Sequence, residues 1–214
     1  IKRHHPAEFL AALLNSQPMG FYSPSQLVQD AKRHGVEVRA PDVMKSDVDC
    51  TLEDMPHPPA VRLGLRMIAG LQWESAERVI AARNERVFDN AEDLARRAGL
   101  ELHEMKLLAA ADALMSLSGH RRQQVWDASA LRSTPELLRD APVDEEILEL
   151  PSAPEGEEVV FDYASLGLTL RSHPMALLRP HLANRRVLTS ADLDAIPNGR
   201  LVRYGTKPTD FLND

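Results

Sequence analysis

The fold is decided by the stretch MIAGLQWESAERVIAAR, residues 67–83. Here Gly70, with apolar neighbours, is followed at once by residues with the spacing of an amphipathic helix. This is the layout of a helix-hairpin-helix, in which the glycine permits positive φ and the next helix begins with backbone N–H groups that can hold a phosphate. Such a hairpin grips a nucleic-acid backbone without reading its bases. The pattern also fits an ordinary glycine turn between two packed helices.

Upstream of this stretch the sequence predicts two helices and a little β structure. The first helix begins at Pro6, a residue suited to the first turn. The second begins after Ser23, which has a Gln three residues later as in a capping box, and it ends at Gly35. Short strands are expected near residues 36–38 and at 51–52.

Downstream, composition predicts a helical region followed by a linker. Three prolines within residues 54–59 mark a boundary, and from Ala60 the chain reads as helical through about Ala130. The acidic, Pro-rich stretch 142–158 has the composition of a linker. Residues 187–202 are typical of a strand, a short helix and a strand, with Asn198-Gly199 as a hairpin turn.

The composition is that of a globular protein and excludes several classes. The net charge is −7, but ten acidic residues and only one basic residue lie between positions 136 and 162. The rest of the chain is therefore nearly balanced in charge, and the net charge neither supports nor excludes DNA binding. The single cysteine, Cys50, excludes an internal disulfide and is expected to be a buried structural thiol in the cytoplasm. No apolar run is long enough for a membrane span or typical of a signal peptide.

Other candidate chemistry is weak in this sequence. The adjacent histidines His4 and His5 do not converge on one ion and have no ligand partner at a suitable spacing, so no metal site is expected. Trp73 and Trp126 stand at helical spacing from other apolar residues, which favours core positions over platforms for base stacking.

Six stretches carry a resemblance to a known family. They are PAEFLAALLNSQPMGFY (6–22), SQLVQDA (25–31), RHGVEV (33–38), SDVDCTLE (46–53), RLGLR (62–66) and DYASLGLTLRSHP (162–174). Together they resemble the bacterial C-family DNA polymerases, and most closely the error-prone, damage-inducible branch of that family. The resemblance covers about residues 1–200 in unbroken order, and residues 15–22 are its most discriminating part.

The resemblance implies a mainly α fold with minor β structure near residues 36–52 and 186–203. It divides the chain into a distal fingers segment (1–56), a tandem helix-hairpin-helix domain (60–131), an acidic Pro-rich linker (132–160), a connecting helix with the beginning of an OB-fold (161–203) and an irregular tail (204–214). Because the chain begins with Ile, we expect it to be a fragment of a longer polymerase, active in translesion synthesis and DNA repair.

The role implied for this part of the family is to hold duplex primer–template DNA through backbone contacts. The expected DNA-binding residues are Ala69, Gly70, Leu71, Arg62 and Arg66, with Arg78, Arg83, Arg121 and Arg122 as secondary candidates. The family's catalytic aspartates lie upstream of Ile1, so this chain should have no catalytic residue and no cofactor, while the parent polymerase should use Mg²⁺.

Two departures from the family pattern reduce the expected grip on DNA. Ala69 stands where the family commonly has a lysine, which removes one phosphate contact. Asp112 stands in a second hairpin, residues 107–114, where the family commonly has glycine. A carboxylate there should repel phosphate and lack the backbone freedom of glycine.

These departures leave a second function open, that of a protein-interaction scaffold. Its acidic stretch 136–162 and its Ala-rich helices would dock other damage-response or replication proteins, with little DNA binding of its own. Neither reading involves a membrane or a small-molecule ligand.

Overall fold

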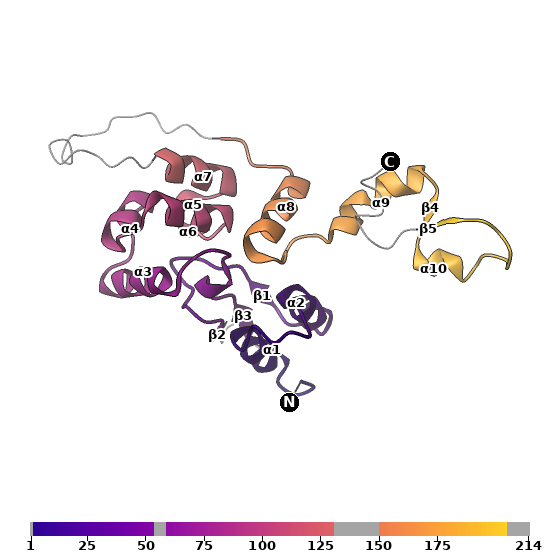
Figure 1. Ribbon diagram of the computed structural model, residues 1–214, viewed down its shortest axis with the longest axis horizontal. Helices are drawn as coiled ribbons and strands as arrows, with labels where there is room; N and C mark the ends of the chain where they lie inside the picture. Colours follow the sequence, from indigo (N-terminus) through magenta and orange to yellow (C-terminus); the bar gives the residue numbers. More distant parts are fainter. Residues whose placement is uncertain (1, 54–58, 131–149, 205–214) are drawn as a thin grey trace. The chain divides into compact units, whose positions relative to one another are not determined.

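The computed structural model describes residues 2–53, 59–130 and 150–204 of the 214-residue chain (Figure 1). The chain forms two compact units, residues 1–170 and 171–214. Within the described residues, the first unit contains helices and three short strands. They are α1 (Pro6–Asn15), α2 (Pro24–Arg33), β1 (Val38–Arg39), β2 (Thr51–Glu53), β3 (Ala60–Arg62), the 3₁₀ helix η1 (Leu65–Met67), α3 (Trp73–Glu85), α4 (Ala91–Arg97), α5 (Leu102–Ala110), α6 (Met115–Ser118), α7 (Arg121–Ala130) and α8 (Glu155–Leu166). The expected mainly α fold is confirmed.

The first two helices begin as the sequence predicts. Pro6 occupies the first turn of α1, and Ser23 caps α2 by accepting a hydrogen bond from the Gln26 amide at 3.3 Å. The Gln26 side chain accepts the Ser23 amide in return at 3.1 Å, which completes the capping box. The two helices bury Leu10, Leu14, Val28 and other apolar side chains in the core of the first unit.

The three strands form one small sheet in the order β1-β3-β2. The prediction that the chain is helical from Ala60 is wrong at this point, because residues 60–62 form β3, parallel to β1 and antiparallel to β2. All three residues of β3 are buried, and pairing on both sides satisfies their backbone groups. The sheet therefore joins the region before the Pro-rich stretch 54–59 to the region after it, within a single compact unit.

The hairpin region follows the sheet. The helix η1, a turn at residues 68–71 and α3 form the first hairpin, while α5, a turn at residues 111–114 and α6 form the second. Between the two hairpins lies α4, whose N-cap Asn90 accepts a hydrogen bond from the Asp93 amide at 2.9 Å. The helix α5 packs against α7 and α8, so α8 belongs to the same body as the hairpins (Figure 1).

The acidic stretch is only partly described. Residues 131–149 lie outside the described part of the chain, but α8 begins at Glu155, inside the region assigned by composition to a linker. Buried Glu158 and Asp162 on α8 show that some of these acidic residues have a structural role instead.

The second unit consists of α9 (Pro174–Asn184), β4 (Val187–Leu188), α10 (Ser190–Leu193) and β5 (Arg203–Tyr204). The expected order of strand, short helix and strand is present. However, β4 and β5 pair in parallel, so the Asn198-Gly199 turn does not join two antiparallel strands as a hairpin. The expected tail lies outside the described residues from position 205 onward.

Candidate nucleic-acid interface

The first hairpin has the turn geometry that its sequence predicts. The Leu71 amide donates to the Ile68 carbonyl at 3.2 Å, and Gly70 between them has a φ of 83°. A Cβ atom at Gly70 would lie 3.5 Å from the Leu107 Cδ1 atom of α5, an ordinary van der Waals contact. Glycine is therefore required at this position for its backbone conformation rather than for space.

The helix α3 begins immediately after this turn, at an exposed surface. The side chain of its N-cap residue, Gln72, caps none of the first-turn amides, and Trp73 and Glu74 are exposed. Uncapped first-turn N–H groups and the helix dipole favour an anion at this end. The carboxylate of Glu74 lies in the same turn and repels a bound phosphate. The geometry of the site therefore favours a phosphate, whereas the charge of Glu74 disfavours it.

The remaining residues of the turn differ in their surroundings. The Ala69 amide donates to the Ser165 carbonyl of α8 at 2.8 Å and is therefore occupied within the protein. The Ala69 side chain is exposed, whereas Leu71 is half-buried and packs against the core. Of the three turn residues expected to contact DNA, Ala69 thus offers only its side chain.

Arg66 lies directly before the turn and links several elements. Its Nη1 atom donates to the Asp49 carboxylate at 2.6 Å and to the Asn15 carbonyl at 3.1 Å, and its guanidinium lies 5.5 Å from the centre of the Trp73 ring. Trp73 is 44% exposed, so the prediction of a core position is wrong for this residue. Its ring covers Arg66 at the surface beside the start of α3, and Arg66 retains partial exposure there.

Arg62 is expected from the sequence to contact DNA, but the structure places it in the interior. Its side chain is buried, and Nε and Nη1 donate at 2.7 Å to the Glu53 carboxylate and to the Ala40 carbonyl. The hydrogen bond from Arg62 lowers the pKa of Glu53 below its usual value, despite burial, which raises it. In this structure the Arg62 guanidinium stabilises the sheet and is not presented to a phosphate.

Arg78 and Arg83 on α3 also bind groups within the protein. Arg78 donates to the Ala98 carbonyl at 2.9 Å and to Glu104 at 3.0 Å, which ties α3 to the end of α4 and to the first turn of α5. Arg83 donates to the carbonyl of Ser46 at 2.6 Å and to that of Val43 at 3.1 Å. The two arginines connect distant parts of the chain through these contacts.

The second hairpin turns at Asp112 in place of glycine. Asp112 has a φ of 60° and is buried, and Gln124 Nε2 donates to its Oδ1 atom at 2.6 Å. Aspartate tolerates the left-handed conformation better than most residues because its short polar side chain bonds locally. The carboxylate is thus directed into the protein, where Gln124 binds it. The expected repulsion of a phosphate by this carboxylate stays a prediction.

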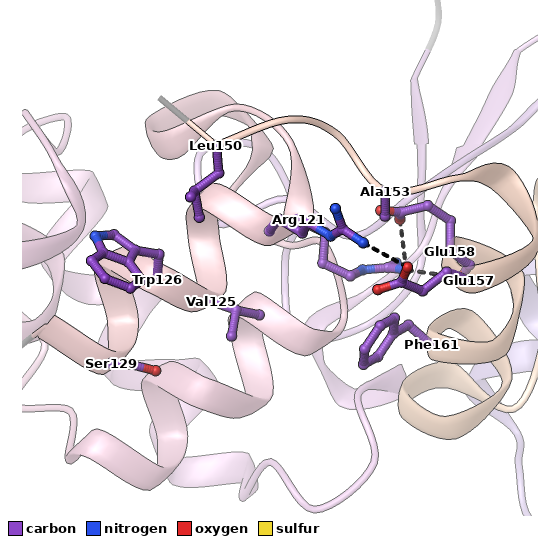
Figure 2. Close-up of a pocket in the computed structure, with 10 residues that line it drawn as sticks. Arg121, Val125, Trp126, Ser129, Leu150, Ala153, Glu157, Glu158 and Phe161 are labelled. Carbon is purple, nitrogen blue, oxygen red and sulfur yellow. Dashed lines mark hydrogen bonds and ion pairs between the residues drawn. The ribbon is translucent and has the colours of Figure 1, made fainter. Parts of the chain in front are cut away.

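Arg121 and Arg122 begin α7 and both bind acidic residues of α8. Arg121 is 2% exposed and donates to the Glu158 carbonyl at 2.8 Å, with an ion pair to the Glu158 carboxylate at 2.8 Å (Figure 2). It also forms an ion pair with the carboxylate of Asp162. Arg122 is half-exposed and pairs with Glu157 at 2.7 Å. The buried position of Arg121 removes it from the set of surface residues that could reach DNA.

An apolar hollow of about 280 Å³ lies between α7 and α8. Figure 2 shows Val125 and Trp126 of α7 and Phe161 of α8 on its walls, with Leu150 at one side. Trp126 is 51% exposed, so the prediction of a core position is wrong here too. Exposed aromatic side chains around a hollow are typical of a surface that binds another molecule.

The partners of the arginines are the functional detail that sequence reasoning missed. The sequence predicts each arginine to be a surface cation. In the structure, Glu53 pairs with the buried Arg62, Glu158 and Asp162 pair with the buried Arg121, and Glu104 pairs with the exposed Arg78. One sequence feature hints at these partners, namely the excess of acidic residues near positions 155–162. Their charge is opposite to that of Arg121 and Arg122, but they lie far from these arginines in the sequence.

Three further observations concern other kinds of site. Cys50 is buried, and burial raises the pKa of its thiol, as expected for a structural cysteine. Among the residues that the structure describes, no group of three His, Cys, Asp or Glu side chains could hold a metal ion. Within the same residues, no helix combines the length and the apolar character needed to cross a bilayer.

Comparison with known proteins agrees with the hairpin geometry. The helix-hairpin-helix motif family matches residues 35–124. Proteins named error-prone DNA polymerase are similar over 95% of this chain, with 54% identity in Dechloromonas aromatica, 52% in Bordetella parapertussis and 50% in Alkalilimnicola ehrlichii. The chain spans 20% of the length of each of these relatives. By sequence, it is therefore a relative of one part of the error-prone DNA polymerases and carries a helix-hairpin-helix motif.

Proposed function

We propose that this chain holds the duplex part of a primer–template through sequence-independent backbone contacts, as one part of an error-prone DNA polymerase. The observation that carries the proposal is the first hairpin. A glycine turn with a φ of 83° leads into α3, whose first-turn amides are not capped by a side chain and lie at an exposed surface. That arrangement suits a phosphate oxygen.

Because most of the candidate arginines bind groups within the protein, we limit the proposed DNA interface to the surroundings of the first hairpin. The buried Arg62 and Arg121 stabilise the fold, and Arg78 and Arg83 bind groups within the protein. Arg66 also binds groups within the protein, but it lies beside Trp73 and directly before the turn, and it keeps partial exposure there. Of these arginines, it is therefore the one that we place beside a phosphate at the start of α3. The second hairpin, with its inward carboxylate, supports the first through the packing of Leu107 beside Gly70.

Polymerase activity belongs, in this proposal, to the longer protein. Primer extension there would use Mg²⁺. The chain by itself is expected not to extend a primer on incubation with Mg²⁺ and deoxynucleotides.

Binding to two blunt duplexes of unrelated sequence tests the proposal. Fluorescence anisotropy should give similar affinities for both, and each affinity should fall steeply as the salt concentration rises from about 50 to about 200 mM, because phosphate contacts release counterions. An affinity that differs strongly between the two sequences, or that does not change with salt, would contradict it.

The hollow between α7 and α8 favours a second candidate function, the docking of another protein. Its walls combine exposed Val125, Trp126 and Phe161, which fit an apolar side chain of a partner. Pull-down from a cell extract with and without nuclease separates the two functions. A protein retained after nuclease treatment, and lost with Trp126→Ala, supports docking, whereas loss of all partners with nuclease favours DNA alone.

A further inference from the structure

A second concave surface, lined by residues between positions 2 and 34, lies between α1 and α2. It is a groove of about 680 Å³ with a largely apolar floor that includes Phe9, Leu13 and Leu27. Phe21 and Tyr22, on the turn that joins the two helices, line the same groove. The two aromatic residues are 91% and 62% exposed, so their ring faces are open to a ligand.

The turn that carries these two rings is held in place by hydrogen bonds. The Gln17 side chain accepts from the Met19 amide at 3.2 Å and donates to the Tyr22 carbonyl at 3.4 Å. Ser23 directly after the turn caps α2. The rings are therefore presented by an ordered turn, and stacking on them does not require the backbone to be ordered first.

Positive charge is concentrated on the segment that forms the groove. Residues 2–34 contain four lysine and arginine side chains against two carboxylates, whereas the whole chain has a net charge of −7. Lys2 and His34 line the groove, and Arg3 and Arg33 are exposed on the same segment. Asp30 also lines the groove, and the Lys2 Nζ atom lies 2.7 Å from its carboxylate. The cations of this segment beyond that ion pair are therefore Arg3, Lys32 and Arg33, all exposed.

The groove and the first hairpin are connected through one side chain. Arg66, which directly precedes the hairpin turn, donates to the carbonyls of Asn15 at 3.1 Å and Gln17 at 3.5 Å, at the start of the aromatic turn. The two surfaces thus belong to one braced body within the first unit. A DNA strand held as duplex at the hairpin can present its unpaired part to a surface of the same body.

We infer that the α1–α2 groove binds the unpaired part of a DNA strand, with bases stacked on Phe21 and Tyr22 and phosphates near Lys2, Arg3 and Arg33. Exposed aromatic rings on a segment rich in cations are a combination that binds single-stranded nucleic acid without sequence preference, because every base has a π face. A peptide would use the apolar floor, but it would gain little from the excess of cations. This inference rests on the proposed function only in taking DNA as the ligand.

The test compares two probes, an oligodeoxythymidylate of about 12 nucleotides, within the usual range of single-strand sites, and a blunt duplex. Phe21→Ala/Tyr22→Ala should weaken binding of the oligothymidylate by about tenfold or more, since each lost stack has a cost of that order. Binding of the blunt duplex should stay within about twofold of the parent chain, a margin well below the effect of one lost stack.

Three controls accompany the double variant. Phe21→Trp/Tyr22→Phe keeps the stacking faces and should retain oligothymidylate affinity. Val87→Ala removes an exposed apolar side chain elsewhere in the first unit and should change neither affinity. Circular dichroism of each variant should match the parent chain, since the substituted rings are exposed.

The outcomes separate this inference from the proposed function. If the double alanine variant binds oligothymidylate as the parent chain does, the groove does not stack bases, and an apolar peptide becomes its better occupant. If the parent chain binds duplex but not oligothymidylate, the groove inference alone fails. If it binds oligothymidylate through these rings but no duplex, the hairpin proposal fails and the inference stands.

Discussion

Gln124 Nε2 donates a hydrogen bond of 2.6 Å to Oδ1 of Asp112, and both side chains are buried. The same Nε2 atom donates to the Gly119 carbonyl at 2.6 Å, and Gln124 Oε1 accepts from the Leu114 amide at 3.0 Å. One glutamine thus ties the turn of the second hairpin to the beginning of α7. Asp112, which the sequence predicts to weaken a DNA contact, is a structural residue of this hairpin.

Replacing this aspartate should mainly affect stability. Asp112→Ala removes an acceptor from a buried amide and should lower the free energy of unfolding by about 1–3 kcal/mol. Asp112→Asn keeps an oxygen acceptor and the tolerance of positive φ, so its loss should be smaller. Urea unfolding followed by tryptophan fluorescence measures both, because Trp73 and Trp126 lie in the first unit. If the two variants are equally stable, or if Asp112→Asn binds duplex more tightly, the Asp112 carboxylate is not the buried acceptor described above.

The two adjacent arginines of α7 should differ sharply in their contribution to stability. Arg121→Met leaves the carboxylates of Glu158 and Asp162 in the interior without their cation, and should lower the free energy of unfolding by about 3–5 kcal/mol. Arg122→Met breaks a half-exposed pair with Glu157 and should cost about 1 kcal/mol or less. Urea unfolding of the pair of variants is the measurement, and similar losses would contradict the buried position of Arg121.

The ion pair of Arg62 and Glu53 predicts a dependence of stability on pH. The hydrogen bond from Arg62 lowers the pKa of Glu53 in the folded chain below its value of 4.5 in the unfolded chain, even though burial raises it. The stabilisation is therefore present above the unfolded pKa and is lost as the pH falls through the folded pKa. Glu53→Gln should reduce stability near neutral pH and flatten the fall on the acidic side. An unchanged acidic slope in urea unfolding at several pH values would contradict the pairing.

The carboxylate in the first turn of α3 should oppose DNA binding. Glu74→Gln removes one negative charge beside the uncapped amides and should tighten duplex binding by roughly two- to fivefold at low salt. Glu85→Gln, on the exposed last residue of the same helix, changes the net charge equally and serves as the matched control. Anisotropy titrations of both variants test the position of the phosphate, and an equal effect of the two would mean that only net charge matters.

Local features of the fold could be predicted from the sequence, whereas long-range pairing could not. The positive φ of Gly70 and the capping box at Ser23 depend on residues within one turn of each other. The strand β3 has three residues, too few for a period to appear, and its pairing partners lie elsewhere in the chain. The sequence therefore predicts helix at these residues.

The candidate site shows the same division. The hairpin turn itself was predicted from its glycine, but the roles of the arginines depend on contacts between distant positions. Arg121 and Asp162 are 41 residues apart in sequence, and Arg83 and Val43 are 40 apart. Nothing in the spacing of a single arginine distinguishes a buried ion pair from a phosphate contact, since both use the same donors. The exposure of Trp73 and Trp126 likewise depends on packing across helices.

The central claim, that the turn of the first hairpin faces a duplex backbone, is tested most directly by adding a charge to it. The side chain of Ala69 is exposed in this turn, so a lysine fits without disturbing the core. Ala69→Met supplies a long side chain without the charge, and Ala81→Lys adds the charge at an exposed position farther along α3.

The measurement is the salt dependence of duplex affinity for these three variants and the parent chain. Ala69→Lys should bind about three- to tenfold more tightly at low salt, with a salt slope steeper by about 0.9, the value for one added phosphate contact. Ala69→Met should match the parent chain, and Ala81→Lys should change the slope less. If Ala69→Lys and Ala81→Lys shift affinity and slope equally, or if Ala69→Lys shifts neither, the turn does not face the duplex.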